Sequence, residues 1–392
     1  MTAARPAIDR RAFLKLGAAA SGLAIGCGRA SREPAAPAEP AAVRLRALGG
    51  TGLEVSEVSF GAHGVDNPPL MAAALEAGIN TFATSGKYLD GREEEALGRA
   101  LREVASDRGR VVVMTGNPVD VHQSASSVLG DIDSSLRRLG SDHIDVYYAA
   151  DLRTPAELRV DAFHEAIAAA KQAGKVRHLG LSGHSGGMQE VLNAAIEDGR
   201  FEVFFIKYDF VSYPDLDGIL ERAAARGIGT IAFKTNAGNR QREVKGLEAG
   251  GLSLREASVK WALMSPAVAS VCVTFGSFEE IRSVTAAVGS PLSVAEARML
   301  GRYADEVRHR YCRFCAACEP SCPHGVAIAD VNRFYMYDAY YQRHAEARQR
   351  YVALGPRRAA VACAGCAAPC EAACPFRRPV RAELLEAHRR LA

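Results

Sequence analysis

The chain has 392 residues, of which 48% are apolar and 24% are charged, and its formal net charge is +3. This balance is typical of a globular protein with a large buried core, and it is too weakly basic to indicate a nucleic-acid-binding protein. No apolar run reaches the roughly 18 residues that a membrane-spanning helix needs, which excludes a multi-span membrane protein.

The N-terminal segment begins with a paired arginine. Arg10 and Arg11 are followed by Phe13 and Leu14, and then by a short, mildly apolar stretch over 16–26. This combination is typical of a twin-arginine export signal, and its apolar stretch is too short to span a bilayer. We therefore expect a signal peptide over 1–30, a Pro/Ala-rich linker over 31–42, and export to the periplasm or the membrane surface. A basic amphipathic helix is the alternative.

Cys27 ends a stretch, residues 24–27, that resembles the cleavage site of a lipoprotein signal. Leu23 stands one place earlier than the usual pattern has its leucine. Two interpretations stay open, a lipid anchor on Cys27 and a chance cysteine in a cleaved peptide. The anchor is the only membrane contact that the sequence predicts.

Short β-branched runs alternate with amphipathic helical segments from residue 43 to about 290. The predicted strands cover 57–61, 79–83, 110–115, 144–149, 177–182, 203–208, 228–233 and 270–274. Eight buried strands, most followed by a helix, predict an α/β fold, a (β/α)8 TIM barrel over 43–290. The alternative, a doubly wound open sheet, is weakened because no Gly-x-Gly-x-x-Gly follows the first strand. A hairpin of Val43–Ala47 and Glu54–Val58 is expected to precede the barrel.

Eight of the ten cysteines lie in two runs near the C-terminus, each ending in Cys-Pro. The first run has the spacing of bacterial ferredoxins, and the second has one extra residue before its third cysteine. We expect all eight to be metal ligands for two [4Fe–4S] clusters that exchange electrons with a redox protein partner. They are Cys312, Cys315, Cys318, Cys322, Cys363, Cys366, Cys370 and Cys374.

Residues 291–392 are thus predicted to form a C-terminal α-helical ferredoxin-like domain. By analogy with two-cluster ferredoxins, Cys374 would complete the set begun by the first run, and Cys322 the set begun by the second. Zinc sites and disulfides are the alternatives, although zinc ligands usually come as separated pairs and closely spaced runs make poor disulfide frameworks. The aromatic segment 327–354 is expected to be one long helix, with domain packing favoured over an electron-relay role.

Motifs throughout 43–290 resemble those of the aldo/keto reductase family, one branch of which carries a ferredoxin-like C-terminal domain. They include Leu48–Ser56, Gly78–Phe82, Ile144–Tyr147, Gly180–His184, Lys207–Tyr208, Phe233–Gly238 and Val273–Ser277. The resemblance implies a site at the C-terminal strand ends, where NADPH delivers a hydride to a carbonyl. It also implies a proton-donating tyrosine whose pKa a lysine and an aspartate lower, with a histidine that orients the substrate.

Only one of these four catalytic positions keeps the family's residue. Tyr88 matches the tyrosine, but the aspartate, lysine and histidine positions are Ala83, Gly116 and Ala150. An unassisted phenol has a pKa of about 10 and is a poor acid at neutral pH. These changes therefore argue against ordinary carbonyl reduction.

Four residues match the family's cofactor-binding positions, namely Ser182, Tyr208, Lys234 and Gly276. Gly183 replaces an expected amide, however, and Glu279 and Glu280 follow Gly276 where a 2′-phosphate would require a basic side chain. These departures make NADP(H) a doubtful cofactor.

The sequence therefore supports an exported iron–sulfur oxidoreductase with a degenerate catalytic tetrad. One alternative is an NAD(P)H-dependent carbonyl reductase that uses Tyr88, and another is a non-catalytic barrel that docks an electron-transfer module. A small carbonyl compound or other ligand is expected at the barrel mouth.

Overall fold

A computed structural model describes residues 43–392, apart from 105–107, 185–186, 212–215 and 239–245. The predicted export signal, Cys27 and the Pro/Ala linker lie outside the described residues. No helix among the residues described is both long and apolar enough to cross a membrane.

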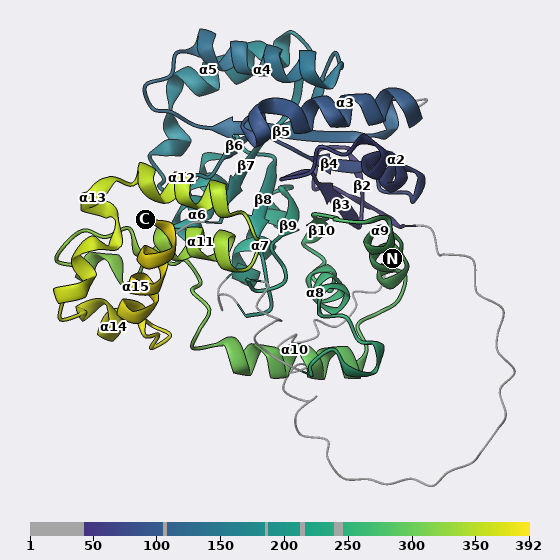
Figure 1. Cartoon of the computed structure of the whole chain (residues 1–392). Helices are drawn as coiled ribbons and strands as arrows, with labels where there is room; N and C mark the ends of the chain where they lie inside the picture. The colour runs from purple at the N-terminus through teal and green to yellow at the C-terminus, as the bar shows by residue number, and fades with distance from the viewer. Residues whose placement is uncertain (1–42, 105–107, 185–186, 212–215, 239–245) are drawn as a thin grey trace, which may run out of the picture.

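Eight parallel strands close into a barrel in the order β10-β3-β4-β5-β6-β7-β8-β9, which confirms the predicted TIM barrel (Figure 1). The closing pair aligns Val271 of β10 with Val58 of β3. The strands are β3 (Val58–Gly61), β4 (Thr81–Ala83), β5 (Val112–Pro118), β6 (Ile144–Ala150), β7 (Val176–Gly183), β8 (Val203–Lys207), β9 (Gly229–Phe233) and β10 (Val268–Val273).

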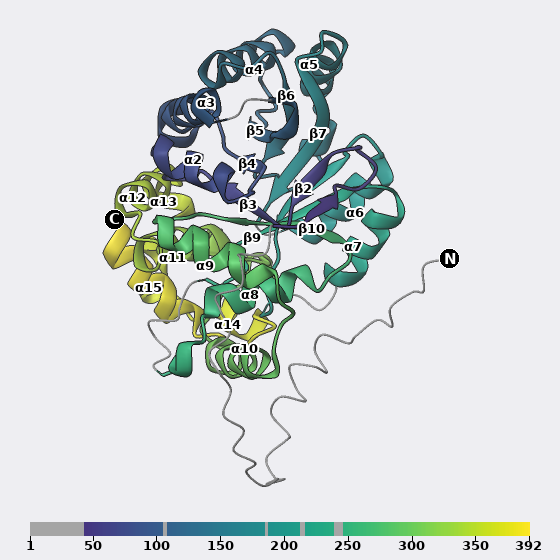
Figure 2. The ribbon, with the colours of Figure 1, turned by 90° about the vertical axis from the view of Figure 1, so that its right-hand side faces the viewer.

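Helices surround the barrel and bury their apolar faces against the strands (Figure 2). They are α2 (Pro68–Glu76), α3 (Arg92–Val104), α4 (Ala125–Leu139), α5 (Asp161–Gln172), α6 (Met188–Asp198), α7 (Leu216–Ala225), α8 (Leu254–Leu263) and α9 (Phe278–Val288). The predicted hairpin is present as β1 (Leu45–Ala47) and β2 (Glu54–Ser56). Its turn lies so close to β9 that a Cβ on Gly49 would stand 2.3 Å from the Gly229 nitrogen, so only glycine is tolerated there.

The C-terminal part consists of short helices gathered on one side of the barrel (Figures 1 and 2). They are α10 (Val294–Val307), α11 (Ile328–Ala339), α12 (His344–Ala353), α13 (Gly355–Arg358), α14 (Pro369–Ala373) and α15 (Val380–Leu391). Helix α10 packs on α8 of the barrel, whereas α11 packs on α12 and α15. One continuous apolar core extends from the helices around the barrel into this part.

The prediction of a single long helix over 327–354 is wrong. The chain leaves α11 at Ala339 and re-enters a helix at His344, with Gln342 in the left-handed region at φ 58°. This break directs the Arg343 side chain to the barrel, where its guanidinium donates hydrogen bonds to His63.

The C-terminal part covers the carboxyl ends of the barrel strands, the end where TIM-barrel enzymes place their chemistry. The contacting barrel residues, His63, Asp151, Asp209 and Lys234, follow β3, β6, β8 and β9 respectively. Their partners in the C-terminal part are Arg343, Arg333, Tyr311 and Tyr337. Any site at the barrel mouth is therefore shared between the barrel and the C-terminal segment.

Candidate functional site

The structure places the three substituted catalytic positions in apolar surroundings. Ala83 and Ala150 lie in the hydrophobic cluster that fills the barrel, together with Tyr148 and Phe205. A Cβ on Gly116 would stand 1.9 Å from the Tyr148 carbonyl oxygen, so this backbone has no room for a lysine. Packed side chains and backbone therefore occupy the space that the family's aspartate, lysine and histidine would need.

Tyr88 lies in a short 3-10 helix, Tyr88–Gly91, and its ring stacks on His63 with ring centres 4.3 Å apart. Burial, reinforced by nearby Tyr337 and Glu93, raises the pKa of the Tyr88 hydroxyl above its usual value. A proton donor in this family needs the opposite shift. The structure therefore gives Tyr88 a packing environment without the groups that would activate it.

The four predicted cofactor-binding residues do not converge on one site. Ser182 is buried at the end of β7. Tyr208 stacks on Trp261 with ring centres 4.9 Å apart, and its hydroxyl donates to Asp217 over 2.5 Å. The Lys234 ammonium donates to the Tyr337 hydroxyl over 3.2 Å.

Gly276 belongs to the loop that resembles the family's phosphate-binding loop. Its N–H already donates a hydrogen bond to an anionic side chain of this chain. It donates to the Glu280 carboxylate over 2.7 Å, and Glu280 forms an ion pair with Arg255 at 2.9 Å. An internal carboxylate thus takes the hydrogen bond that the resemblance assigns to a cofactor phosphate.

A buried polar cluster joins the barrel mouth to α11, and its centre is Arg333, which is 1% exposed. The Arg333 guanidinium donates to Asp151 over 2.9 Å, to Asp330 over 2.8 Å and to His184 Nδ1 over 3.1 Å. Because a guanidinium only donates, Nδ1 of His184 accepts and the ring proton lies on Nε2. Burial, with Lys234 and Arg333 nearby, lowers the pKa of His184 well below its usual value, so this histidine is neutral. Sequence reasoning did not identify Arg333, because nothing but its place in an aromatic segment marks it.

The eight C-terminal cysteines are free thiols in the structure. Burial and the neighbouring Cys312, Cys315 and Cys374 raise the pKa of the Cys318 thiol to about 12. Burial and the neighbouring Cys322, Cys370 and Cys366 raise the pKa of the Cys363 thiol to about 11. The first set of thiols is therefore Cys312, Cys315, Cys318 and Cys374, and the second set is Cys322, Cys363, Cys366 and Cys370.

The backbone around both sets is shaped to stabilise anionic sulfur. The Phe314 N–H donates to the Cys312 sulfur, and the Ala368 N–H donates to the Cys366 sulfur, each over 3.4 Å. Phe314, Ala316 and Ala368 have positive φ values of 59°, 56° and 58°. Successive right- and left-handed residues form concave nests of N–H groups, which bind anions and iron–sulfur centres.

A buried cation accompanies the first set. The Arg378 guanidinium is 4% exposed, it lies near Cys312, Cys374 and Cys318, and it donates to Asn332 over 3.0 Å. No three His, Cys, Asp or Glu side chains within the described ranges converge on the position of one metal ion. A cubane needs a wider spread of ligands than one ion does, because each of its four irons takes its own thiolate.

Comparison with known proteins identifies the barrel. The model of the aldo/keto reductase family matches residues 65–243. The matched part of the barrel is similar in sequence to this family. Members of this family are oxidoreductases and typically use NADP(H).

The curated relatives of this segment include the aldo-keto reductase AFTS1 of Alternaria alternata, 26% identical over 49% of this chain and 65% of the relative. They also include L-galactose dehydrogenase of Arabidopsis thaliana, 34% identical over 36% of this chain and 49% of the relative. The chain thus spans about half to two thirds of the length of these two relatives. The structure resembles the holo form of the aldo-keto reductase AKR11C1 of Bacillus halodurans, with a TM-score of 0.55 and 21% identity over 67% of this chain and 96% of that one. This last likeness establishes the fold alone.

The residues present do not fit the family's usual cofactor. The Tyr148 carbonyl leaves no room for a catalytic lysine at position 116. The Tyr208 ring stacks on Trp261, and the Glu280 carboxylate accepts the hydrogen bond of the Gly276 N–H. These residues therefore do not support the family's hydride transfer.

Proposed function

We propose that this chain is an exported, aldo/keto-reductase-like iron–sulfur oxidoreductase whose eight C-terminal cysteines hold two [4Fe–4S] clusters. One observation carries the proposal. The thiols form two groups of four, each with three members from one run and the fourth from the other. This is the ligand exchange known for two-cluster ferredoxins.

The chain's own residues suit such centres. Each group supplies four thiols for one cubane, and the nests beside Cys312 and Cys366 direct N–H groups at sulfur. The buried Arg378 guanidinium lies near the first group, and its ion pair with Glu383 balances its charge. When bound, the clusters supply one-electron transfer, which a barrel without a working tetrad does not provide.

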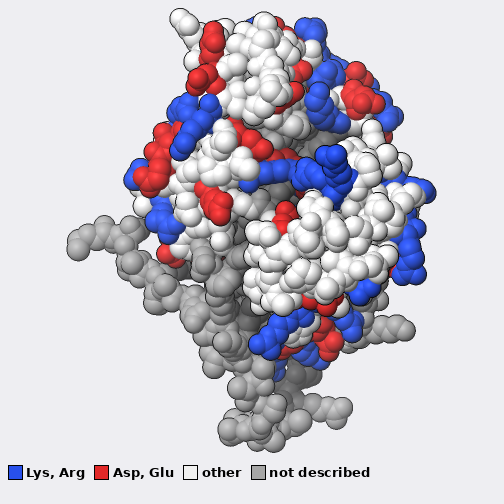
Figure 3. Space-filling model, turned by 90° about the vertical axis from the view of Figure 1, so that its left-hand side faces the viewer, with Lys and Arg blue, Asp and Glu red and all other residues white. Residues whose placement is uncertain are grey.

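The place of action is the exported side of the membrane. The support is the Arg10-Arg11 pair with Phe13 and Leu14, together with the twin-arginine route's ability to carry folded, cofactor-loaded proteins. A redox protein supplies or takes the electrons. Figure 3 shows basic and acidic side chains interspersed on one face of the molecule, with no single-sign field of the kind that nucleic acid requires.

Anaerobic purification of the full chain tests the proposal. We expect about eight irons and eight sulfides per chain, broad visible absorbance, and an EPR signal after reduction. Cys318→Ala should remove about half of the iron. Cys272→Ser is the matched control, because Cys272 lies on β10 away from both groups, and it should retain all the iron. A chain that contains zinc, or that forms disulfides between the two runs without any iron, would refute the proposal.

A further inference from the structure

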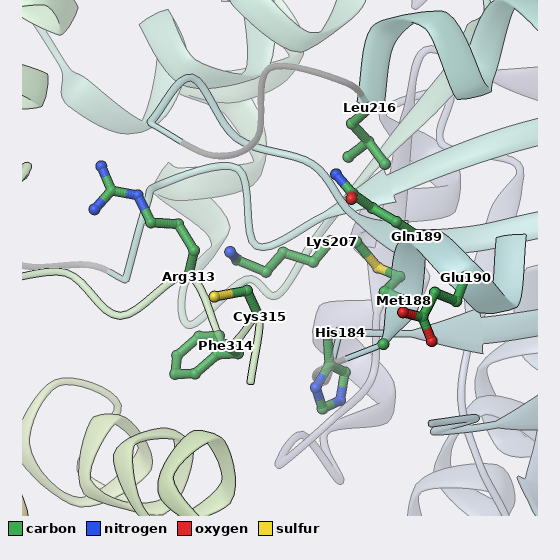
Figure 4. Close-up of a pocket in the computed structure, with 10 residues that line it drawn as sticks. His184, Met188, Gln189, Glu190, Lys207, Leu216, Arg313, Phe314 and Cys315 are labelled. Atoms are coloured by element: carbon green, nitrogen blue, oxygen red, sulfur yellow. The ribbon is translucent and has the colours of Figure 1, made fainter. Parts of the chain in front are cut away.

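The two sets of thiols differ in what surrounds them. The first run lies against the barrel mouth, where the Lys207 ammonium stands 5.3 Å from the centre of the Phe314 ring. Phe314 and Cys315 line one pocket together with Lys207 and His184 (Figure 4). The first set is therefore the inner one, next to the end of the barrel where TIM-barrel enzymes place their chemistry.

The second set lies at the far end of the C-terminal part. Cys363 belongs to a 3-10 helix, η7 (Ala360–Gly365), and Cys370 belongs to α14. These elements pack on α13, on α15 and on a further 3-10 helix, η6 (Glu319–Ser321), all of which lie in the C-terminal part. Figure 1 shows α13 and α14 at the outer edge of the molecule, away from the barrel strands. A redox protein that approaches from this side reaches the second set before the first.

The surface over the second set is uncharged. Within 359–376, a range that the structure describes throughout, Glu371 is the one charged residue, and its carboxylate accepts from the Arg381 N–H over 3.0 Å. Figure 3 views this side of the molecule and shows a broad area of uncharged side chains, edged in part by basic ones. We define the uncharged face by five exposed residues, Val361, Ala364, Gly365, Ala367 and Pro369. Because these residues are small, the surface of a partner can come close to the thiols beneath them.

Arginine side chains border the uncharged face. The segment 341–392 contains ten arginines and no lysine against four acidic side chains, a formal charge of +6 in a chain whose total is +3. The structure describes this segment in full, and seven of its arginines are exposed, whereas each of its four glutamates is half-buried. Arg357 and Arg358 end α13 just before η7, and the Arg381 guanidinium donates to two carbonyl oxygens of η7, over 3.0 and 2.6 Å. The border of the face is therefore basic.

An uncharged centre with a basic border indicates the charge of the partner. Electron-transfer proteins form small, short-lived interfaces, and complementary charges at the rim steer their encounter. The face therefore suits a protein whose own redox site is surrounded by aspartate and glutamate. An anionic membrane suits it less, because proteins that lie on a bilayer insert several large apolar side chains. Val361, 53% exposed, is the one exposed side chain of that kind within 359–376.

We propose that the uncharged face docks a small acidic electron-transfer protein, which exchanges single electrons with the centre on the second set. In the direction tested below, the partner is oxidised and this centre is reduced, and the electron continues to the first set beside the barrel mouth. The proposal rests on the proposed function, because the second set carries electrons only when it holds a cluster. Docking itself depends on side chains outside both sets of thiols.

A reduced, acidic [2Fe–2S] ferredoxin, which is a low-potential donor, is the probe. It is mixed in a stopped-flow instrument with the full, cluster-loaded chain at increasing salt. We expect a second-order rate constant that falls as the salt rises, because salt screens the charges that steer the encounter. Arg357→Glu with Arg358→Glu should lower this rate constant about tenfold or more at low salt. If that pair fails to fold, Arg357→Gln with Arg358→Gln should act in the same direction at full iron content.

Arg99→Glu with Arg137→Glu is the matched control. It makes the same change of charge at exposed arginines of α3 and α4, which lie away from α13 and α14 (Figures 1 and 2). The control should react nearly as fast as the unaltered chain. An equal loss in both double variants would show that only net charge matters and would overturn the docking proposal, as would a rate constant that salt leaves unchanged.

Three further results separate the proposals. Iron-loaded chain that neither binds nor oxidises the ferredoxin refutes the docking proposal alone. The same holds if vesicles containing phosphatidylglycerol bind the chain through Arg357 and Arg358 while the ferredoxin reaction ignores both arginines, because the face would then be a membrane surface. Calorimetric binding of oxidised ferredoxin that needs both arginines, in a chain that takes up no iron, supports the docking face and refutes the clusters.

Discussion

Tyr148 occupies the space that a side chain at position 116 would need, with its carbonyl oxygen 1.9 Å from the place of a Cβ on Gly116. The two residues are register partners on β5 and β6, so neither moves without disturbing the sheet. The loss of the family's lysine is therefore built into the barrel backbone and is more than a change of one side chain.

Restoring the family's residues should accordingly fail. We expect the triple variant Ala83→Asp, Gly116→Lys, Ala150→His to show no NADPH-dependent aldehyde reduction above background. Gly116→Lys alone should lose about 1–3 kcal/mol of unfolding free energy through overpacking. Urea denaturation and NADPH absorbance measure the two effects, and a triple variant that reduces aldehydes would show that the backbone adapts.

Single cysteine substitutions can test whether the last cysteine of each run binds the cluster of the other run. Cys322 lies in the first run, but its thiol neighbours are Cys363 and Cys370 of the second. Cys322→Ala should therefore change the same EPR component as Cys366→Ala, and Cys374→Ala the same component as Cys315→Ala. The opposite pairing of spectra would mean that each run serves its own cluster.

Arg333 is expected to be the main polar link between barrel and C-terminal part. Arg333→Met removes one cation from Asp151 and Asp330, which both keep an ion pair with Arg153, so we expect a loss of about 1.5–3 kcal/mol of unfolding free energy. Thermal unfolding of the full chain measures the loss. Arg348→Met, which removes an exposed arginine of α12, should leave the melting temperature nearly unchanged.

Glu93 makes stability depend on pH. Burial is the main cause that raises its pKa from 4.5 to about 8, although the Gly64 N–H donates to its carboxyl group over 2.5 Å. Between these two values the folded chain keeps a proton that the unfolded chain releases. Glu93 therefore lowers stability as the pH rises through this window, by up to about 1.4 kcal/mol per pH unit.

Glu93→Gln mimics the protonated side chain and should remove this contribution. We expect the variant to match the unaltered chain at pH 5 and to exceed its unfolding free energy at pH 8, in urea titrations at both pH values. Glu94→Gln is the contrasting neighbour, since it takes the charge partner from Arg138 and should destabilise at both pH values. Parallel pH profiles for Glu93→Gln and the unaltered chain would contradict the assignment.

The sequence predicts the barrel well, because eight β-branched runs separated by amphipathic helices leave few other folds. The boundaries are less certain. Strand β5 continues to Pro118, three residues beyond its predicted end, since its second part, Met114–Pro118, pairs with Val146–Ala150 of β6. No glycine or proline in the sequence marks the helix break at Gln342. The break accompanies a contact between Arg343 and His63, which lie far apart in the sequence. The role of the cysteines can be predicted from their spacing, whereas the role of Arg333 becomes visible only when both parts of the chain are placed together.

The way the two cysteine runs share their thiols has a practical consequence for dissecting the molecule. A fragment that stops after Pro323 keeps three thiols of the first set and one of the second, and a fragment that starts after it keeps the complementary four. Neither piece carries a complete quartet. The complete second set spans Cys322 to Cys370, so a chain that ends between Cys370 and Cys374 would keep that set whole and leave the first set one thiol short.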